Sequence, residues 1–212
     1  MLRNPHSIVK WFEEEVAHYT GAPYAVSCDN CTNAIRMCCE YLKVEEVTIP
    51  SRTYVSVPQS IIQAGGQVRL SDKEWKGIYK LSPYPIYDAA KRFTSNMYIE
   101  GSLMCLSFGI KKNLKLGKGG MILTDSLEAV EKLKKLRWSG RVEGVPMPED
   151  EIESMGYNSY ITPEWAARGL MLLSVYPEQH PDQEEPGGYP DLAQYGFIKK
   201  RQYDRYGFYG SR

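Results

Sequence analysis

Apolar side chains recur at the spacing of an α-helix in five segments of this 212-residue chain. In residues 7–19 they form one side of a helix with glutamates on the other side, and Gly21 ends that helix. The same spacing predicts four more helices, over residues 34–42, 55–64, 127–136 and 162–173. The basic residues near the end of the fourth helix are expected to lie on its solvated face; they are Lys132, Lys134, Lys135 and Arg137.

Short apolar runs between these helices predict β-strands. They lie at residues 24–26, 46–49, 67–70 and 86–87, and two more flank a glycine-rich turn inside residues 103–125. Strands that alternate with helices predict an α/β fold: a three-layer, mixed and mostly parallel sheet flanked by helices. Residues 73–85 show little periodicity and predict no element. We expect residues 1–175 to form this domain. Residues 176–212, rich in Pro, Gly and Tyr, would form an extended tail packed on the domain or on a partner, and no separate C-terminal domain.

The charge balance disfavours several classes of function. Lys and Arg together number 26, as do Asp and Glu, so no net charge attracts nucleic acid or an anionic membrane. No apolar run approaches the roughly 20 residues that span a bilayer, and the glutamates from position 13 come too early for a signal peptide. We therefore expect a cytoplasmic protein without a membrane partner. Basic and aromatic residues interleave in 197–212, a mix that can bind single-stranded nucleic acid, but the zero net charge disfavours it.

The five cysteines do not have the spacing of a metal site. Cys28 and Cys31 have the CxxC spacing of a redox or zinc pair. A zinc site needs a second pair, whereas Cys38 and Cys39 are adjacent in a predicted helix and the three histidines lie elsewhere. We expect buried free thiols in a reducing compartment and no metal.

The stretch from Leu103 to Asp125 carries the strongest candidate chemistry. Its first apolar run ends at Ser107 and Phe108, and four lysines and a glycine-rich turn follow before the second run. A lysine held on a loop between two buried strands can lose solvation, which lowers its pKa and makes it an amine nucleophile. A solvated basic hairpin is the alternative interpretation.

Two polar loops at predicted strand ends are candidate binding sites. The loop Ser27–Asn33 opens a helix, and the unpaired N–H groups of a first helical turn bind anions. An ordinary helix cap at Thr32 or Asn33 is the alternative. Asp88 ends a strand and precedes small residues, a position that points into the ligand crevice of α/β proteins. A helix cap is again the alternative.

Six motifs along the chain occur in the order found in one enzyme family. They are FEEEVAHYTGAPYAV, NCTNAI, IPSRTYVSV, YDAAK, SFGIKKNLKLGKGG and GYNSYITPEWAARGL. Between Val9 and Leu173 the chain thereby resembles the DegT/StrS family of sugar aminotransferases, which have the aspartate-aminotransferase fold and use pyridoxal 5'-phosphate (PLP). The resemblance implies the large PLP-binding domain of that fold in a shortened form, because the chain stops about where the family begins its small C-terminal domain.

The resemblance implies roles for residues around the cofactor ring. Lys112, five positions after Ser107 as in the family, would form the Schiff base with PLP and shuttle the proton during transamination. Asp88 would pair with the pyridinium nitrogen, and Tyr54 would stack on the ring. Lys91 stands where the family has a glutamine near the ring hydroxyl. It would stabilise a phenolate, compete with Lys112 or bind a substrate phosphate.

Other residues would bind the phosphate of the cofactor. The resemblance assigns Thr32, Asn33 and Ser107 to it, together with the N–H groups at the helix start. Cys31 replaces the family's glycine in this turn, which narrows the backbone conformations open there. Asn158 would reach the phosphate of the partner subunit, so the resemblance implies a homodimer with shared active sites.

The activity implied by the resemblance is transfer of an amino group from an amino acid such as glutamate to a nucleotide-linked keto-sugar. The alternative is a dimer that binds PLP without turnover and acts as an interaction or regulatory module. The sequence does not identify the sugar, the carbon atom that is aminated or the amino donor, because those contacts lie in loops and in the family's C-terminal part.

Overall fold

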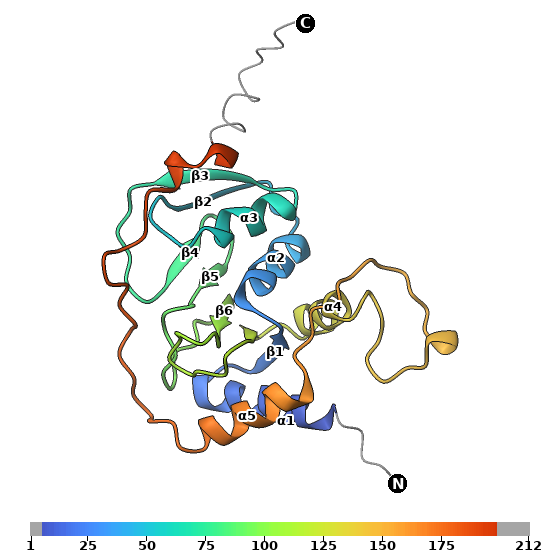
Figure 1. Ribbon diagram of the computed structural model, residues 1–212. Coiled ribbons are helices and arrows are strands. Elements are labelled where there is room, and N and C mark those ends of the chain that lie inside the picture. Colours follow the sequence, from blue (N-terminus) through green and yellow to red (C-terminus); the bar gives the residue numbers. More distant parts are fainter. Residues whose placement is uncertain (1–5, 199–212) are drawn as a thin grey trace, which may run out of the picture.

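The computed structural model describes residues 6–198, in which helices surround a central sheet (Figure 1). The α-helices are α1 (Ser7–Thr20), α2 (Cys31–Tyr41), α3 (Ser56–Gln63), α4 (Leu127–Arg137) and α5 (Pro163–Leu173). The strands are β1 (Tyr24–Cys28), β2 (Glu46–Pro50), β3 (Gln67–Ser71), β4 (Tyr79–Leu81), β5 (Ile86–Asp88), β6 (Leu103–Ser107) and β7 (Gly120–Thr124). Two 3₁₀ turns lie in the loops, η1 (Met147–Glu149) and η2 (Leu192–Gln194). Within the described range no helix is long and apolar enough to cross a bilayer.

The predicted helices and strands are all present, with small shifts at their ends. Local signals placed several ends correctly: the Ser126 hydroxyl accepts a hydrogen bond from the Ala129 N–H at the start of α4, and Gly21 ends α1 with φ 74°. Strand β4 was missed in the segment 73–85, because a strand of three residues is too short to show a period.

The main sheet has five strands in the order β1-β7-β6-β5-β4, and β2 and β3 form a separate parallel pair. The α/β fold class is confirmed, but the direction of the strands differs from the prediction. Three of the four neighbouring pairs in the main sheet are antiparallel, and only β5 and β6 run parallel within the described residues. The reason is the connections: β4 joins β5, and β6 joins β7, through hairpin loops without a crossover helix, which return the chain in the opposite direction.

The sheet forms the middle of three layers. Different helices cover its two faces. Successive side chains along a strand point to opposite faces, so each strand contributes to both apolar clusters. In β6, Leu103 and Cys105 belong to the apolar cluster that contains α2 and α4, whereas Met104 and Leu106 belong to the cluster that contains α1 and α5. Both faces are therefore buried, and the edge where β5 and β6 end is left for a site.

Strand β7 packs against the start of α2 so closely that a side chain does not fit between them. A Cβ atom on Gly120 would lie 2.5 Å from the Asn30 carbonyl carbon and 2.7 Å from the Cys31 nitrogen. We expect Gly120→Ala to lower the free energy of unfolding by about 1–3 kcal/mol, as overpacking does, measured by urea denaturation. Gly196→Ala is the control, because no atom lies within 4 Å of its added Cβ. Equal stability of Gly120→Ala and the unmodified protein would contradict this close approach.

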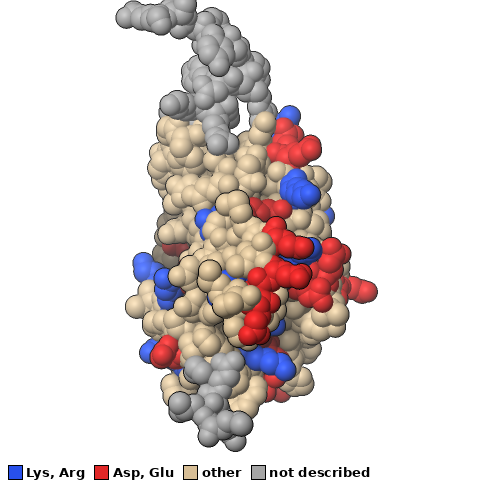
Figure 2. Space-filling model, turned by 90° about the vertical axis from the view of Figure 1, so that its right-hand side faces the viewer, with Lys and Arg blue, Asp and Glu red and all other residues tan. Residues whose placement is uncertain are grey.

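The loop of residues 141–155 projects from the domain (Figure 1), and acidic side chains gather in a band on the face drawn in Figure 2. Glu149, Glu151 and Glu153 of this loop are exposed. Negative side chains repel nucleic-acid phosphates, so this face is unsuited to nucleic acid.

The segment after α5 runs along one side of the domain to the strands β2 and β3 (Figure 1). The Tyr19 hydroxyl donates a hydrogen bond to the Pro177 carbonyl at 2.7 Å near its start. Near its end Leu192 is fully buried, and its N–H donates to the Ser51 carbonyl at 2.8 Å. Residues 176–198 thus pack on the domain. The basic and aromatic segment 197–212, considered above for nucleic-acid binding, lies almost wholly outside the described residues.

Candidate functional site

A cavity of about 670 Å³ lies at the edge where β5 and β6 end and α2 begins. The carboxyl ends of neighbouring parallel strands are the usual ligand-binding edge of an α/β sheet. Seven of the nine residues singled out in the sequence line this cavity: Cys31, Thr32, Tyr54, Asp88, Lys91, Ser107 and Lys112. The structure thus brings together side chains that are as much as 81 positions apart, from Cys31 to Lys112.

Asp88 forms the fixed floor of the cavity. Its side chain is almost completely buried, and its Oδ1 accepts a hydrogen bond from the Ala90 N–H at 2.9 Å. The Tyr79 hydroxyl donates to Oδ2 at 2.7 Å and lies 2.7 Å from the Thr53 hydroxyl. Burial raises the pKa of Asp88, while the hydrogen bonds from Ala90 and Tyr79 and the charge of Lys112 oppose the rise. The carboxylate is held in one orientation and can pair with a cationic group.

The structure separates the two interpretations of Asp88, which were a carboxylate facing the ligand crevice and a helix cap. Asp88 caps no helix, because a turn follows it.

Tyr79 and Thr53 were missed as members of the site. Tyr79 lies in the segment without periodicity, and Thr53 looked like one polar residue among several in a loop. A buried aspartate needs hydrogen-bond donors to its carboxylate oxygens. That requirement is the one signal in the sequence that could have prompted a search for such residues.

Lys112 is half-buried on the loop that follows β6. Its backbone N–H donates to the Gly109 carbonyl at 2.9 Å, which closes a turn in this loop. Its ammonium charge opposes the rise in the pKa of both Asp88 and Cys31, which line the same cavity. Lys111 also lines the cavity but is exposed, whereas Lys115 does not line it. Lys112 is thus the half-buried lysine of this loop that lines the cavity, and its role toward a cofactor stays a prediction.

The start of α2 presents one wall of the cavity. Its cap is Asn30, whose Oδ1 accepts a hydrogen bond from the Asn33 N–H at 2.8 Å, so neither Thr32 nor Asn33 is the cap. The Thr32 hydroxyl donates to the Ser56 hydroxyl at 2.8 Å, beside the start of α3. Asn33 does not line the cavity, because its side chain turns away and donates to Asp29 at 2.7 Å. Thr32 and Ser56 therefore offer hydroxyl groups at this wall, next to the first-turn N–H groups of α2.

Two residues with predicted roles lie at or beyond the rim. Tyr54 lines the cavity but is 56% exposed, and its ring centre lies 6.4 Å from that of Tyr189. Asn158 is exposed, forms an isolated bridge with Trp138 and does not line the cavity. Its position is open to another chain, and its role toward a partner subunit stays a prediction.

Lys91 is the second amine of the cavity, and its side chain is only 6% exposed. Its Nζ lies 3.1 Å from the Glu185 carboxylate and 4.9 Å from the centre of the Tyr189 ring. Glu185 and Tyr189 line the cavity but were missed in the sequence. They follow Lys91 by more than 90 positions in a segment without periodicity, so no local pattern connects them to the site.

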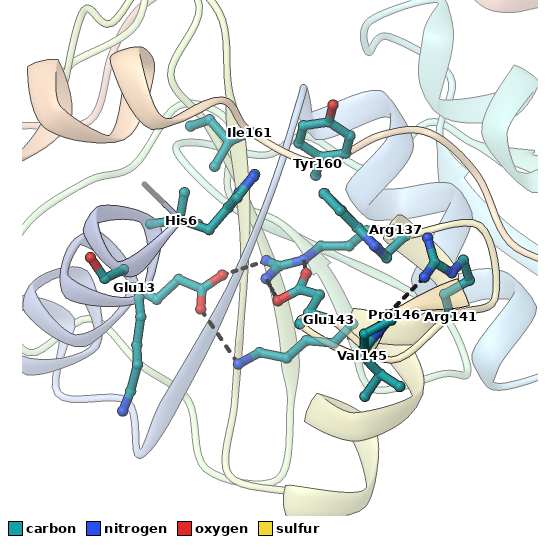
Figure 3. Close-up of a pocket in the computed structure, with 15 residues that line it drawn as sticks. His6, Glu13, Arg137, Arg141, Glu143, Val145, Pro146, Tyr160 and Ile161 are labelled. Atoms are coloured by element: carbon teal, nitrogen blue, oxygen red, sulfur yellow. Dashed lines mark hydrogen bonds and ion pairs between the residues drawn. The ribbon is translucent and has the colours of Figure 1, made fainter. Parts of the chain in front are cut away.

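A second cavity of about 630 Å³ lies between the start of α1, the end of α4 and the loop after it (Figure 3). Arg137 at its base is 2% exposed, which corrects the prediction of a solvated position. Its guanidinium donates to the Ser27 carbonyl at 2.7 Å, to Glu143 at 2.6 Å and to Glu13. Glu13 is also buried, although it was placed on the polar side of its helix. These charges bind one another, so the cluster holds α1, β1 and α4 together.

The five cysteines are buried with free thiols, as expected. Burial raises the pKa of the Cys31 thiol well above its ordinary value, and the nearby charge of Asp88 raises it further. The Cys31 thiol is therefore mostly protonated at neutral pH, so it forms a neutral part of the cavity wall and reacts only slowly as a nucleophile.

Comparison with known proteins supports the resemblance described above. The model of the DegT/DnrJ/EryC1/StrS aminotransferase family matches residues 2–99 and 88–185. A GDP-perosamine synthase of Caulobacter vibrioides is 25% identical over 84% of this chain and 59% of its own length. A DegT DnrJ EryC1 StrS aminotransferase from Brucella abortus has a TM-score of 0.69 at 19% identity, covering 80% of this chain and 58% of its own. A sugar aminotransferase from Streptococcus pneumoniae, solved in the PLP form, has a TM-score of 0.65 at 17% identity, covering 80% of this chain and 59% of its own.

The relatives are longer than this chain, which spans less than two thirds of the length of each. The solved structures establish the fold, that of aminotransferases with helices on both faces of a mixed sheet. The family match covers most of the chain, including every residue that lines the cavity up to position 185. The chain belongs to the DegT/DnrJ/EryC1/StrS aminotransferase family.

Proposed function

We propose that the protein is a PLP-dependent aminotransferase that moves an amino group from an amino acid such as glutamate to a nucleotide-linked keto-sugar. The observation that carries this proposal is that Lys112 and Asp88, which are 24 positions apart in the sequence, line one cavity. The name of the relative from Caulobacter vibrioides, a GDP-perosamine synthase, supports a nucleotide-linked sugar as the acceptor.

The residues of the cavity fit PLP. A volume of about 670 Å³ is within the usual range of about 300–1,000 Å³ for small-molecule sites. The walls offer an amine at Lys112, a fixed carboxylate at Asp88, an aromatic ring at Tyr54 and hydroxyl groups beside the start of α2. When bound, PLP supplies the electron sink that transamination requires.

Each of these groups has a distinct part in the proposed chemistry. The Lys112 amine would bind the cofactor covalently and would then carry a proton between the amine-bearing carbon of the substrate and the cofactor. The Asp88 carboxylate, held by Tyr79 and Ala90, would keep a proton on a ring nitrogen next to it. Thr32, Ser107 and the first-turn N–H groups of α2 would hold a phosphate.

The proposed assembly is a homodimer with shared active sites. Asn158 is exposed and lies outside the cavity of its own chain, which leaves it free to reach the cavity of a second copy. The structure contains one chain, so this assembly rests on the resemblance.

A spectral titration tests the proposed function. We expect purified protein given PLP to show the visible band of lysine-bound PLP, and L-glutamate to convert it to the pyridoxamine form. Adding 2-oxoglutarate should restore the band, and D-glutamate is the control that should leave it unchanged. The second candidate, a PLP-binding module without turnover, is favoured by the tail residues that lie across the cavity. It predicts a band that no amino donor bleaches. Absence of any lysine-bound band would contradict both functions.

A further inference from the structure

Part of the tail lies across the cavity as a strap, defined here as residues 183–189. Five of its seven residues line the cavity: Gln183, Glu184, Glu185, Pro186 and Tyr189. Before the strap, Asp182 is held by Arg92, whose Nε and Nη2 each donate to its carboxylate at 2.7 Å. After the strap, Leu192 is fully buried in the main core. The strap is therefore fixed at both ends and bridges the cavity between them.

The central contact of the strap is the ion pair between Glu185 and Lys91. A cation as buried as Lys91 requires an anionic partner, because an unpaired charge away from water is strongly destabilising. The Glu185 carboxylate supplies that charge at 3.1 Å, and the strap backbone adds a hydrogen bond of 2.8 Å from the Gln183 N–H to the Lys91 carbonyl. The hydrogen bond from Lys91 lowers the pKa of Glu185, which keeps its carboxylate ionised. Lys91 is thus an anion site that the chain itself fills.

The strap has both a hinge and space to move. Gly187 and Gly188 have φ values of 80° and 68°, a left-handed conformation that glycine adopts without strain, and no atom lies within 4 Å of a Cβ built on either. A second hollow of about 670 Å³ adjoins the cavity and shares with it Lys91 and the strap residues Gln183, Glu184, Glu185 and Tyr189. The strap thus borders two hollows, and its two glycines give the backbone between its fixed ends room to change conformation.

We propose that the strap is a gate in which Glu185 acts as an internal carboxylate ligand of Lys91, and that the carboxylate of an incoming amino donor replaces it. The gate follows from the geometry alone, whereas the identity of the incoming group rests on the proposed function. Glu185 carries the same side-chain carboxylate as glutamate, so the exchange would swap one carboxylate for another at Lys91. In the closed state the strap lines the same cavity as Lys112 and Asp88.

Two readouts that need no PLP test the gate. The first is the rate at which a small thiol reagent labels Cys31, the cysteine that lines the cavity, followed by mass spectrometry of its peptide. We expect Glu185→Gln to speed this labelling about fivefold. A factor of about five corresponds to the upper end of the stabilisation that a partly exposed ion pair contributes. Glu184→Gln is the matched control, because Glu184 lies next to Glu185 and forms none of the ion pairs recorded for residues 6–198. Equal rates in the two variants, or a parallel rise at Cys28 outside the cavity, would overturn the gate.

A double variant tests whether Glu185 holds the strap through Lys91. In Lys91→Gln the ion pair is already absent, so adding Glu185→Gln should change the Cys31 labelling rate by less than twofold, within the error of such cycles. A further fivefold rise in this background would show that Glu185 holds the strap through another group and would overturn its role as a ligand of Lys91.

The second readout is hydrogen exchange of the backbone amides in residues 183–189. Glutarate, a dicarboxylate without an amino group, should speed this exchange in the unmodified protein, whereas sodium chloride at equal ionic strength should not. Equal effects of the two salts, or none, would overturn the exchange of carboxylates at Lys91. Because neither readout uses PLP, the gate can hold even if no lysine-bound PLP forms, and it can fail while the spectral titration succeeds.

Discussion

Replacing Lys112 with alanine should abolish the visible band of lysine-bound PLP. It should also lower the rate of amino transfer roughly 10⁴-fold, which is the upper end of the rate increase that a positioned acid–base group provides. Lys112 lines the same cavity as Asp88 and has the family's spacing after Ser107. The other lysines of the cavity differ from it, because Lys91 is paired with Glu185 and Lys111 is exposed. The measurement is the absorbance of the PLP complex, followed by single-turnover conversion with L-glutamate. The proposed function predicts loss of both signals together.

Lys111→Ala is the matched control for this result. Lys111 precedes Lys112 on the same loop and lines the same cavity, but it is exposed. Its removal should leave the visible band in place. Borohydride reduction of the PLP complex, with mass spectrometry of the peptides, should locate the cofactor on Lys112. A modified Lys111, or a normal band in Lys112→Ala, would contradict the assignment.

Replacing Arg137 with methionine should lower the free energy of unfolding by about 3–5 kcal/mol, because it leaves the buried Glu13 without its main partner. The loss concerns stability and not chemistry, since Glu13 and Arg137 line the second cavity (Figure 3), whereas Lys112 does not line it. Urea denaturation measures it. Lys132→Met, on an exposed position of the same helix, should change the stability by less than about 0.5 kcal/mol.

A second variant and the pH dependence test the cause of this loss. Adding Glu13→Gln to Arg137→Met removes the isolated charge and should recover part of the stability. Burial alone would raise the pKa of Glu13, but the charges of Arg137 and Lys134 outweigh burial and hold the pKa below its ordinary 4.5. A lowered carboxyl pKa contributes stability above pH 4.5 that is lost as the pH falls through the folded-state pKa. In Arg137→Met this acid-induced loss should disappear. If the acid profiles of the two proteins coincide, Glu13 is not stabilised by Arg137.

The amino-acid sequence by itself determined where the α-helices and all the strands except β4 lie, and which residue types gather at the ends of the central strands. Apolar spacing and end signals such as Ser126 are local, so they survive without knowledge of the rest of the fold. The spacing of Lys112 after Ser107, read against the family, singled out one lysine among four for the same reason. The position of Asp88 at the end of a strand was also local, and the structure places both residues on one cavity.

Only the tertiary structure decided which distant segments meet. Periodicity shows that a side chain lies on the polar side of a helix, but it does not show that a second charged helix covers that side. For this reason Glu13 and Arg137, 124 positions apart, were misplaced in solvent. Strand direction depends likewise on the path of the connections, and the pairing of Lys91 with Glu185 depends on where the tail returns. Such contacts form between surfaces that exist only after each element has folded and packed, so no local pattern records them.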